Sequence, residues 1–107
     1  MADPELDEPA RYEVFIAPLA ERQIDAIYAY LAGVLLVPET AIEIVDAIEE
    51  GILSLEVMPN RGALRRTGAY AGQYRQIFAG RFVILYRVDD AARTVMVVAV
   101  KHTLQDF

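Results

Sequence analysis

The sequence predicts an α+β domain of two layers, in which a helical hairpin packs on one face of a mainly antiparallel sheet in the order β-α-α-β-β-β. Three observations support this prediction. Apolar residues recur at helical spacing between residues 19 and 55, residues 74–88 and 94–100 are rich in β-branched and aromatic side chains, and turn signals separate the strands. Two helices with one apolar side each need a sheet face to cover them, which gives a two-layer domain.

The first strand and the first helix are read from a change of period. Residues 12–16 (Tyr-Glu-Val-Phe-Ile) alternate and then run apolar up to Pro18, which predicts a short strand. A helix over residues 19–31 follows. Its apolar face consists of Ile24, Ile27, Tyr28 and Leu31. We expect Gly33 to end this helix as a left-handed C-cap, and residues 34–37 to pack as a buried connector.

A second helix is predicted from Pro38, which suits the first helical position, with Glu39 near the positive helix end. Its apolar face extends over about five turns. This face consists of Ala41, Ile44, Val45, Ile48, Ile52 and Leu55. Gly51 inside the helix indicates either close packing against the first helix or a bend. Residues 59–72 follow as the longest irregular stretch.

The three remaining strands come from the last third of the chain. The dipeptide Ala79-Gly80 lies between two apolar runs and predicts a hairpin turn. Residues 82–85 are continuously apolar, as expected for a central strand covered on both faces. Residues 89–92 (Asp-Asp-Ala-Ala) predict the next turn, and residues 94–100 the last strand.

Length and composition indicate one domain. The chain has 107 residues, 55% of them apolar, and no apolar run near the roughly 20 residues that span a bilayer. Residues 1–10 contain two prolines and four acids, which predicts a disordered acidic leader, with the folded domain over residues 11–107. The acidic N-terminus does not resemble a signal peptide, so we expect a cytoplasmic protein without a membrane partner.

The net charge of −6 is divided unevenly along the chain. Residues 1–10 carry −4, residues 11–57 carry −7 and residues 58–107 carry +5. The predicted helices are therefore acidic and the predicted sheet is basic. Such asymmetry suggests a charged partner for the basic half, although arginines that only solvate a sheet face would give the same pattern.

Several kinds of chemistry are disfavoured by the residue inventory. The chain has one histidine and no cysteine, and its acids follow a helix face at solvated spacing, so we expect no metal site. The glycines match no phosphate-binding loop, and the only serine, Ser54, has no Ser-His-Asp arrangement around it. We expect no cofactor.

The chain resembles the RelE/ParE superfamily, the small toxins of bacterial type II toxin–antitoxin (plasmid stabilisation) modules. The residues that carry the resemblance lie in four segments from about Tyr12 to Phe107. These are residues 37–41 (Val-Pro-Glu-Thr-Ala), 53–59 (Leu-Ser-Leu-Glu-Val-Met-Pro), 84–88 (Ile-Leu-Tyr-Arg-Val) and 98–102 (Val-Ala-Val-Lys-His). The resemblance implies a toxin neutralised by an antitoxin whose extended segment wraps around it. Members divide into ribosome-dependent mRNA endonucleases (RelE-like) and gyrase poisons (ParE-like).

The nuclease branch can be tested against its chemistry, because attack by a 2′-hydroxyl needs a base and cations that stabilise the phosphorane. The resemblance implies that basic residues on the second and third strands and in the C-terminal segment supply these groups. Arg75 matches one such position, whereas Ile77 and Val83 stand where further cations are expected. Residues 103–105, after His102, also lack the arginines of close relatives. Three of four expected cations are absent, and a pI near 4.6 suits ribosomal RNA poorly.

Two sets of candidate site residues result. A rearranged nuclease site would be built on Arg75, Arg81, Tyr86 and His102. Binding of an antitoxin or target would use Arg61, Arg65, Arg66, Arg75 and Arg87. Each residue also has a structural reading: His102 as a strand-end hydrogen-bonding group, Tyr86 as a core tyrosine, and the arginines as solvated charges.

The sequence favours a ParE-like toxin that binds a cellular target, with a cognate antitoxin as partner. DNA gyrase is the first target implied, and the ribosome with mRNA is the second. The alternatives are a RelE-like, metal-independent endoribonuclease and a degenerate member that binds antitoxin without toxicity. A homodimer and a toxin–antitoxin hetero-oligomer both remain open, as do strand addition and helix-in-groove docking of the antitoxin.

Overall fold

The computed structural model describes residues 10–105 and 107. The predicted acidic leader lies outside the described residues, except for Ala10. The helices and strands have these bounds: β1 Glu13–Ile16, α2 Pro18–Ala29, α3 Pro38–Leu53, β2 Ala63–Leu64, β3 Arg75–Ala79, β4 Phe82–Asp89 and β5 Thr94–His102. Among the described residues, no helix has the length and apolar character needed to cross a bilayer.

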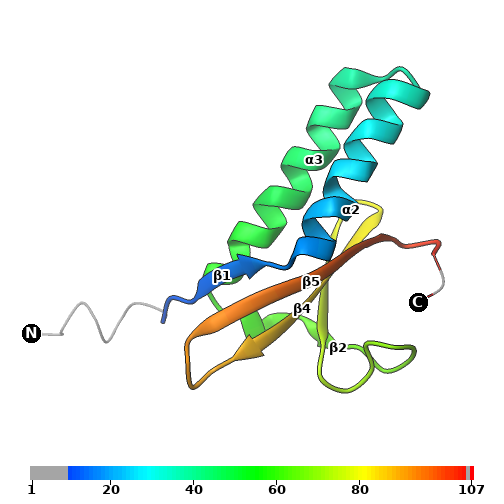
Figure 1. The fold of residues 1–107 in the computed structure, drawn as a ribbon. Coiled ribbons are helices and arrows are strands. Elements are labelled where there is room, and N and C mark those ends of the chain that lie inside the picture. The colour runs from blue at the N-terminus through cyan, green and yellow to red at the C-terminus, as the bar shows by residue number, and fades with distance from the viewer. Residues whose placement is uncertain (1–9, 106) are drawn as a thin grey trace, which may run out of the picture.

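The strands form one sheet in the order β1-β5-β4-β3-β2. β1 pairs with β5 in parallel, and all other neighbours are antiparallel. The helical hairpin of α2 and α3 packs on one face of this sheet and extends beyond it (Figure 1). The predicted two-layer α+β fold with a mainly antiparallel sheet is thus confirmed. The predicted order lacks only β2, a two-residue strand within the stretch read as irregular.

The core lies on both faces of β4, as the continuous apolar run predicts. Ile84 and Tyr86 face the helices. They pack with Ile48 and Ile52 of α3 and with Leu55 in the 3₁₀ turn that follows α3. Val83 and Leu85 face the other way, where Tyr70, Val98, Ala99 and Phe107 cover them. Residues 83–86 are all buried, because alternate side chains of this central strand enter two different clusters.

A β-bulge in the ladder between β4 and β5 decides which residues of β5 face the helices. Leu85 pairs with Ala99 and Tyr86 with Val97, so Val98 has no partner on β4. Side chains before and after this extra residue therefore change faces. As a result, Val97 and Val100 both enter the cluster beneath the helices, although they are three residues apart.

The hairpin tip differs from the prediction. Gly33 is not a left-handed cap: a π-helical turn over Tyr30–Val34 extends α2 through it, and the left-handed residue is Leu36, with φ 56°. Residues 34–37 are exposed rather than buried. The prediction of a buried connector was wrong because the hairpin extends past the edge of the sheet, where nothing in the described chain covers its end.

Two glycine positions were partly predicted. A Cβ at Gly51 would lie 3.0 Å from Ile84 Cδ1, so this glycine marks close packing, but against β4 rather than against α2. Gly80, with φ 58°, begins a two-residue turn with Arg81, and Ala79 pairs with Phe82. The hairpin turn is therefore one residue later than the predicted Ala79-Gly80.

Candidate functional site

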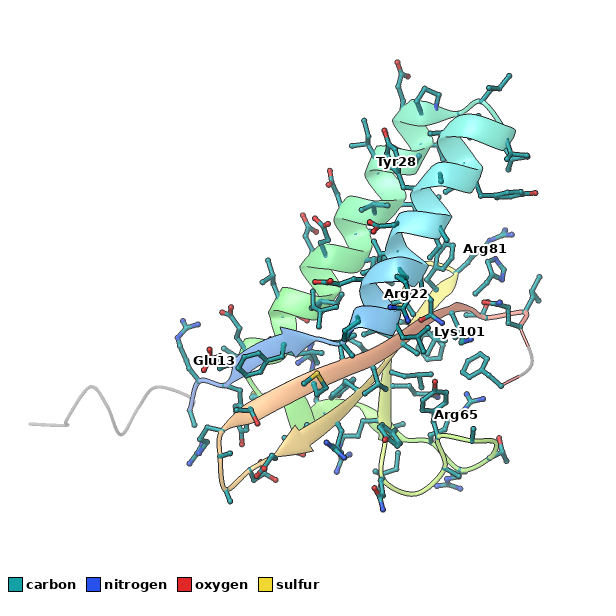
Figure 2. All side chains as sticks on the ribbon, in the orientation of Figure 1. Glu13, Arg22, Tyr28, Arg65, Arg81 and Lys101 are labelled. Carbon is teal, nitrogen blue, oxygen red and sulfur yellow. The ribbon has the colours of Figure 1, made fainter. Side chains whose placement is uncertain are left out.

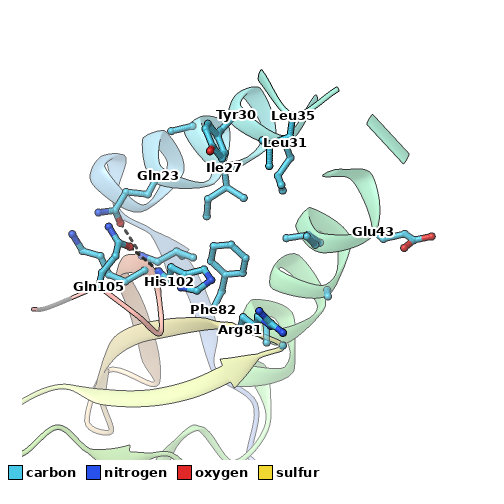
Figure 3. A pocket seen from close by; sticks show the side chains of 17 residues that line it. Gln23, Ile27, Tyr30, Leu31, Leu35, Glu43, Arg81, Phe82, His102 and Gln105 are labelled. Atoms are coloured by element: carbon cyan, nitrogen blue, oxygen red, sulfur yellow. Dashed lines mark hydrogen bonds between the residues drawn. The ribbon is translucent and has the colours of Figure 1, made fainter. Parts of the chain in front are cut away.

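An apolar groove of about 840 Å³ lies between the helical hairpin and the end of the sheet formed by the β3–β4 turn and the end of β5 (Figure 3). Apolar side chains from both layers line it, among them Ile27, Leu31, Leu35, Ile44, Phe82 and Val100. Its polar lining residues are Gln23, Tyr30, Glu43, Arg81, Lys101, His102 and Gln105. On the sheet side these include two cationic residues, Arg81 and Lys101, so the groove is apolar with a basic rim.

His102 is held at the rim by its own hydrogen bonds. Its Nδ1 accepts a hydrogen bond from the backbone N–H of Leu104 at 3.1 Å, and its backbone N–H donates to Gln105 Oε1 at 2.7 Å. The ring stands edge-to-face against Phe82, with 5.2 Å between centroids. The ring nitrogen that accepts carries no proton in this arrangement. The predicted role as a strand-end hydrogen-bonding group fits these contacts.

The Gln23 side chain accepts a hydrogen bond from the backbone of β5 in the part of this strand that no longer pairs with β1. The pairing of β1 ends at Ile16 and Val97, and the side-chain Oε1 of Gln23 accepts a hydrogen bond from the N–H of Val100 at 2.8 Å. This contact fixes α2 over β5 and shapes one wall of the groove. Gln23 and Lys101 were not predicted as site residues. Their positions in the helix and strand patterns indicate no role, and only their neighbours in the folded structure do.

Tyr86, a candidate catalytic residue, is fully buried at the opposite end of the sheet. Its hydroxyl donates to the carbonyl of Pro59 at 2.6 Å and accepts from the N–H of Gly62 at 3.2 Å. Burial raises the pKa of this hydroxyl above its ordinary value, despite the opposing effects of the Gly62 hydrogen bond and the nearby guanidinium groups of Arg61 and Arg75. The hydroxyl ties the loop after α3 to the sheet and presents no free face to a substrate.

Two of the predicted binding arginines hold the same loop. Arg61 Nη1 donates to the carbonyls of Ser54, Val57 and Met58, and its Nη2 donates to Ser54 Oγ at 2.6 Å. Arg75 Nη1 donates to the carbonyl of Gly62 at 2.7 Å. These guanidinium groups satisfy carbonyls in a segment with few backbone partners of its own.

Arg65 and Arg66 line a second, smaller pocket of about 670 Å³, which Arg75 also lines. Arg65 donates to Gln76 Oε1 at 3.0 Å and to the carbonyl of Phe107 at 2.7 Å, and it stacks over the Phe107 ring at 4.2 Å. Within the described part of the chain the one ion pair joins Arg11 and Glu56. The three arginines of this pocket therefore form no ion pair with a side-chain carboxylate of the described residues, and Arg65 and Arg75 already donate to main-chain oxygens.

The structure does not bring the arginines of the two candidate sets together. Arg75 is the cross-strand partner of Tyr86 on the helix-facing side, whereas the side chain of Arg87 points to the other side of the sheet. Arg81 lies in the turn between β3 and β4, at the opposite end of this strand pair from Arg75. The proposed nuclease set is divided likewise: Arg81 and His102 line the groove, whereas Arg75 and Tyr86 serve the loop.

The comparisons with known proteins agree with this architecture. A family model described as "ParE toxin of type II toxin-antitoxin system, parDE" matches residues 14–107. No curated protein matches the chain significantly.

Three solved structures share the fold. A chain of the chromosomal ParDE toxin–antitoxin system from P. aeruginosa has a TM-score of 0.71 at 23% identity, covering 87% of this chain and 97% of that one. A chain of the toxin–antitoxin complex RelBE2 from Mycobacterium tuberculosis has a TM-score of 0.65 at 24% identity, covering 86% and 98%. A chain of the archaeal RelE–RelB complex from Pyrococcus horikoshii OT3 has a TM-score of 0.59 at 11% identity, covering 90% and 99%.

The predicted resemblance is thereby confirmed, and the ParE branch is the one that the family model matches. Because that model covers residues 14–107, the chain belongs to the ParE family of toxins of type II toxin–antitoxin systems.

Proposed function

We propose that this ParE-type toxin acts by binding a cellular protein, with DNA gyrase as the first target to test, and that a cognate antitoxin silences it by occupying the apolar groove. The observation that carries the proposal is the groove itself. It is the larger of the pockets described here, and it combines apolar walls from both layers with a basic rim on the sheet side. The three solved structures of similar fold come from toxin–antitoxin systems, which supports an antitoxin as the occupant.

The chemistry of the groove defines the segment that fits it. Ile27, Leu31 and Phe82 offer apolar surface to an amphipathic helix or an extended apolar segment (Figure 3). The cationic side chains of Arg81 and Lys101 lie along one side, so the bound segment would carry acidic residues on the matching side. An antitoxin segment with an apolar stripe and flanking carboxylates meets both conditions.

Binding rather than RNA cleavage is favoured by the positions of the candidate nuclease residues. The Tyr86 hydroxyl is occupied by two backbone groups, and Val83 is buried where the resemblance implies a catalytic cation. Arg81 and His102 remain together at the groove, and they are the residues that an endoribonuclease reading would have to use. This alternative predicts mRNA cleavage on ribosomes that His102→Ala abolishes.

The test begins with expression of the full chain in a bacterium, with and without the antitoxin candidate from the neighbouring reading frame. We expect growth arrest that the antitoxin relieves. The double variant Arg81→Glu/Lys101→Glu should weaken antitoxin binding by about a hundredfold, because it reverses two rim charges at roughly tenfold each. The matched control is Arg66→Glu, an exposed arginine outside the groove, which should leave this affinity unchanged.

Two activity assays then separate the targets. Inhibition of DNA supercoiling by purified gyrase, with mRNA intact on ribosomes, supports the proposal. Ribosome-dependent mRNA cleavage lost in His102→Ala would overturn it in favour of the nuclease. Absence of growth arrest with intact antitoxin binding would instead identify a degenerate member.

A further inference from the structure

The end of the helical hairpin carries a second apolar surface, which lies beside the groove. We call the exposed apolar residues there that do not line the groove the hairpin tip: Tyr28, Val34, Leu36, Val37 and Ile42. Leu36 is 75% exposed and Val34 is 65% exposed. Residues 26–38 contain no charged side chain at all. Large apolar side chains gathered at a projecting end are typical of an interaction surface.

The backbone of the tip also departs from the regular conformation. Residues Tyr30–Val34 form a π-helical turn, and Leu36 adopts a left-handed conformation with φ 56°. Glycine or asparagine would adopt that conformation more readily than leucine. The chain therefore places a large apolar side chain at a position that disfavours it for both solvation and backbone reasons. Such a combination is typical of functional rather than structural sites.

The charges around the tip define what can cover it. Asp25 on α2 and Glu39 and Glu43 at the start of α3 are the charged residues nearest to the tip in the sequence, and no lysine, arginine or histidine lies between Arg22 and Arg61. Figure 2 shows oxygen-tipped side chains along α3 toward the free end of the hairpin, where Tyr28 is labelled on α2. A nucleic acid would be repelled by these carboxylates. A second copy of the tip would bring the same acidic residues together, so self-association there is disfavoured too.

We infer that the hairpin tip is the surface by which the toxin engages its protein target, and that the target offers an apolar cleft flanked by lysine or arginine. This inference rests on the proposed function for the role of that partner. The toxin then has two surfaces of opposite preference. The groove with its basic rim takes an acidic amphipathic segment, and the tip with its acidic surroundings takes a basic one.

The variant that tests this surface is Val34→Ser/Leu36→Asn. Asparagine suits the left-handed position and removes the exposed apolar side chain, so the denaturation midpoint should be unchanged or raised while target engagement is lost. The matched control is Leu104→Asn, which replaces another largely exposed leucine outside the tip. A structural role for the tip would instead lower the midpoint.

Two synthetic helical peptides with identical leucine positions serve as probes, one with lysine and one with glutamate at the polar positions. The Lys/Leu peptide should bind the wild-type chain, lose at least fivefold affinity in Val34→Ser/Leu36→Asn, and be insensitive to Arg81→Glu. The Glu/Leu peptide should show the reverse pattern. Failure of the Lys/Leu peptide to bind, or binding that the tip variant leaves unchanged, overturns the inference.

In cells, the tip variant should need at least tenfold more toxin for growth arrest, while it still co-purifies with the antitoxin and Leu104→Asn behaves as wild type. Undiminished arrest by the tip variant overturns the inference. So does a dimer seen in sedimentation that the tip variant abolishes, since a second copy would then be the occupant. If the wild-type chain arrests no growth, the proposed function fails, and the peptide measurements alone decide the nature of the tip.

Discussion

The two ends of the sheet use the same kind of residue in opposite ways. At the β3–β4 turn, Arg81 and Lys101 line an open groove. At the other end, Arg61 and Arg75 donate to the carbonyls of the loop that follows α3. At one end the cations line the groove that we propose takes the antitoxin, and at the other they hold the chain's own backbone. A basic residue in this fold is therefore a binding candidate only where its donors are not already taken.

The physical reason lies in the backbone of each end. The β3–β4 turn closes a regular ladder, so its strands need no help from side chains. The loop over residues 57–62 pairs with little of the sheet, and its carbonyls need donors. Guanidinium groups, with five N–H donors in a planar fork, satisfy several carbonyls at once. Four predictions test this contrast, from the largest expected effect to the smallest.

Gly62→Ala should lower the free energy of unfolding by about 3 kcal/mol, because an added methyl group overpacks a closed site. A Cβ there would collide with the Tyr86 hydroxyl and lie 2.8 Å from the carbonyl oxygen of Gln76. Urea denaturation measures the change. The control is Gly33→Ala in the hairpin, where nothing lies within 4 Å, and we expect no loss or a gain of up to about 1 kcal/mol. Equal losses of stability in the two variants would contradict the prediction that Gly62 lies in a closed site and Gly33 in an open one.

Tyr86→Phe should cost about 2 kcal/mol, since the Pro59 carbonyl and the Gly62 N–H would be left buried without a partner. The pH profile gives a second readout. Because the folded pKa of Tyr86 is raised above 10.0, the stability that its protonated hydroxyl contributes is present below that pH. It is lost as the pH rises through the folded value. Alkaline denaturation that is identical in wild type and Tyr86→Phe would contradict this assignment.

Arg61→Ala and Arg81→Ala compare the two ends directly. Arg61→Ala should cost about 1 kcal/mol through its lost hydrogen bonds and leave antitoxin affinity unchanged. Arg81→Ala should leave the free energy of unfolding unchanged and weaken antitoxin binding. Thermal denaturation and titration calorimetry on each variant separate the two effects. A reversed outcome would mean that the arginines of the loop, not those of the groove, meet the partner.

Asp90→Asn should give the smallest effect, confined to acidic pH. Hydrogen bonds from Tyr12 at 2.6 Å and Asn60 at 2.9 Å lower the pKa of this exposed carboxyl below 3.8. The stability contributed by the carboxylate is thus present above that pH and lost as the pH falls through the lower, folded value. Melting temperatures measured between pH 2 and pH 6 should converge for variant and wild type at the acid end. A constant difference across that range would contradict the prediction.

Local patterns explain what could be predicted and what could not. The strand at residues 82–85 and the helix after Pro38 follow from periodicity, because each depends on neighbours within a few residues. The strand β2 was missed, since Ala63 and Leu64 become a strand only through pairing with Gln76 and Arg75. The prediction that residues 34–37 form a buried connector was wrong for a similar reason. An apolar run does not reveal whether another layer of the fold covers it.

The candidate site divides in the same way. The basic character of the last half and the scarcity of nuclease cations could be read directly from the residues, and both point to a binding toxin. The groove could not be predicted from the sequence, because Gln23 contacts Val100 across 77 positions of the chain. In addition, a bulge at Val98 decides which way the side chains at the end of β5 face.

The sequence by itself thus determined the order of the elements apart from β2, the acidic hairpin, the basic sheet and the family, since periodicity, charge and motif spacing are properties of the chain alone. Only the tertiary structure decided which polar side chains hold the chain's own backbone. The Tyr86 hydroxyl reaches Pro59 and Gly62 across 27 and 24 residues, and Arg75 reaches Gly62 across 13. A hydrogen bond of that kind forms only after distant segments have packed together, so no local pattern records it.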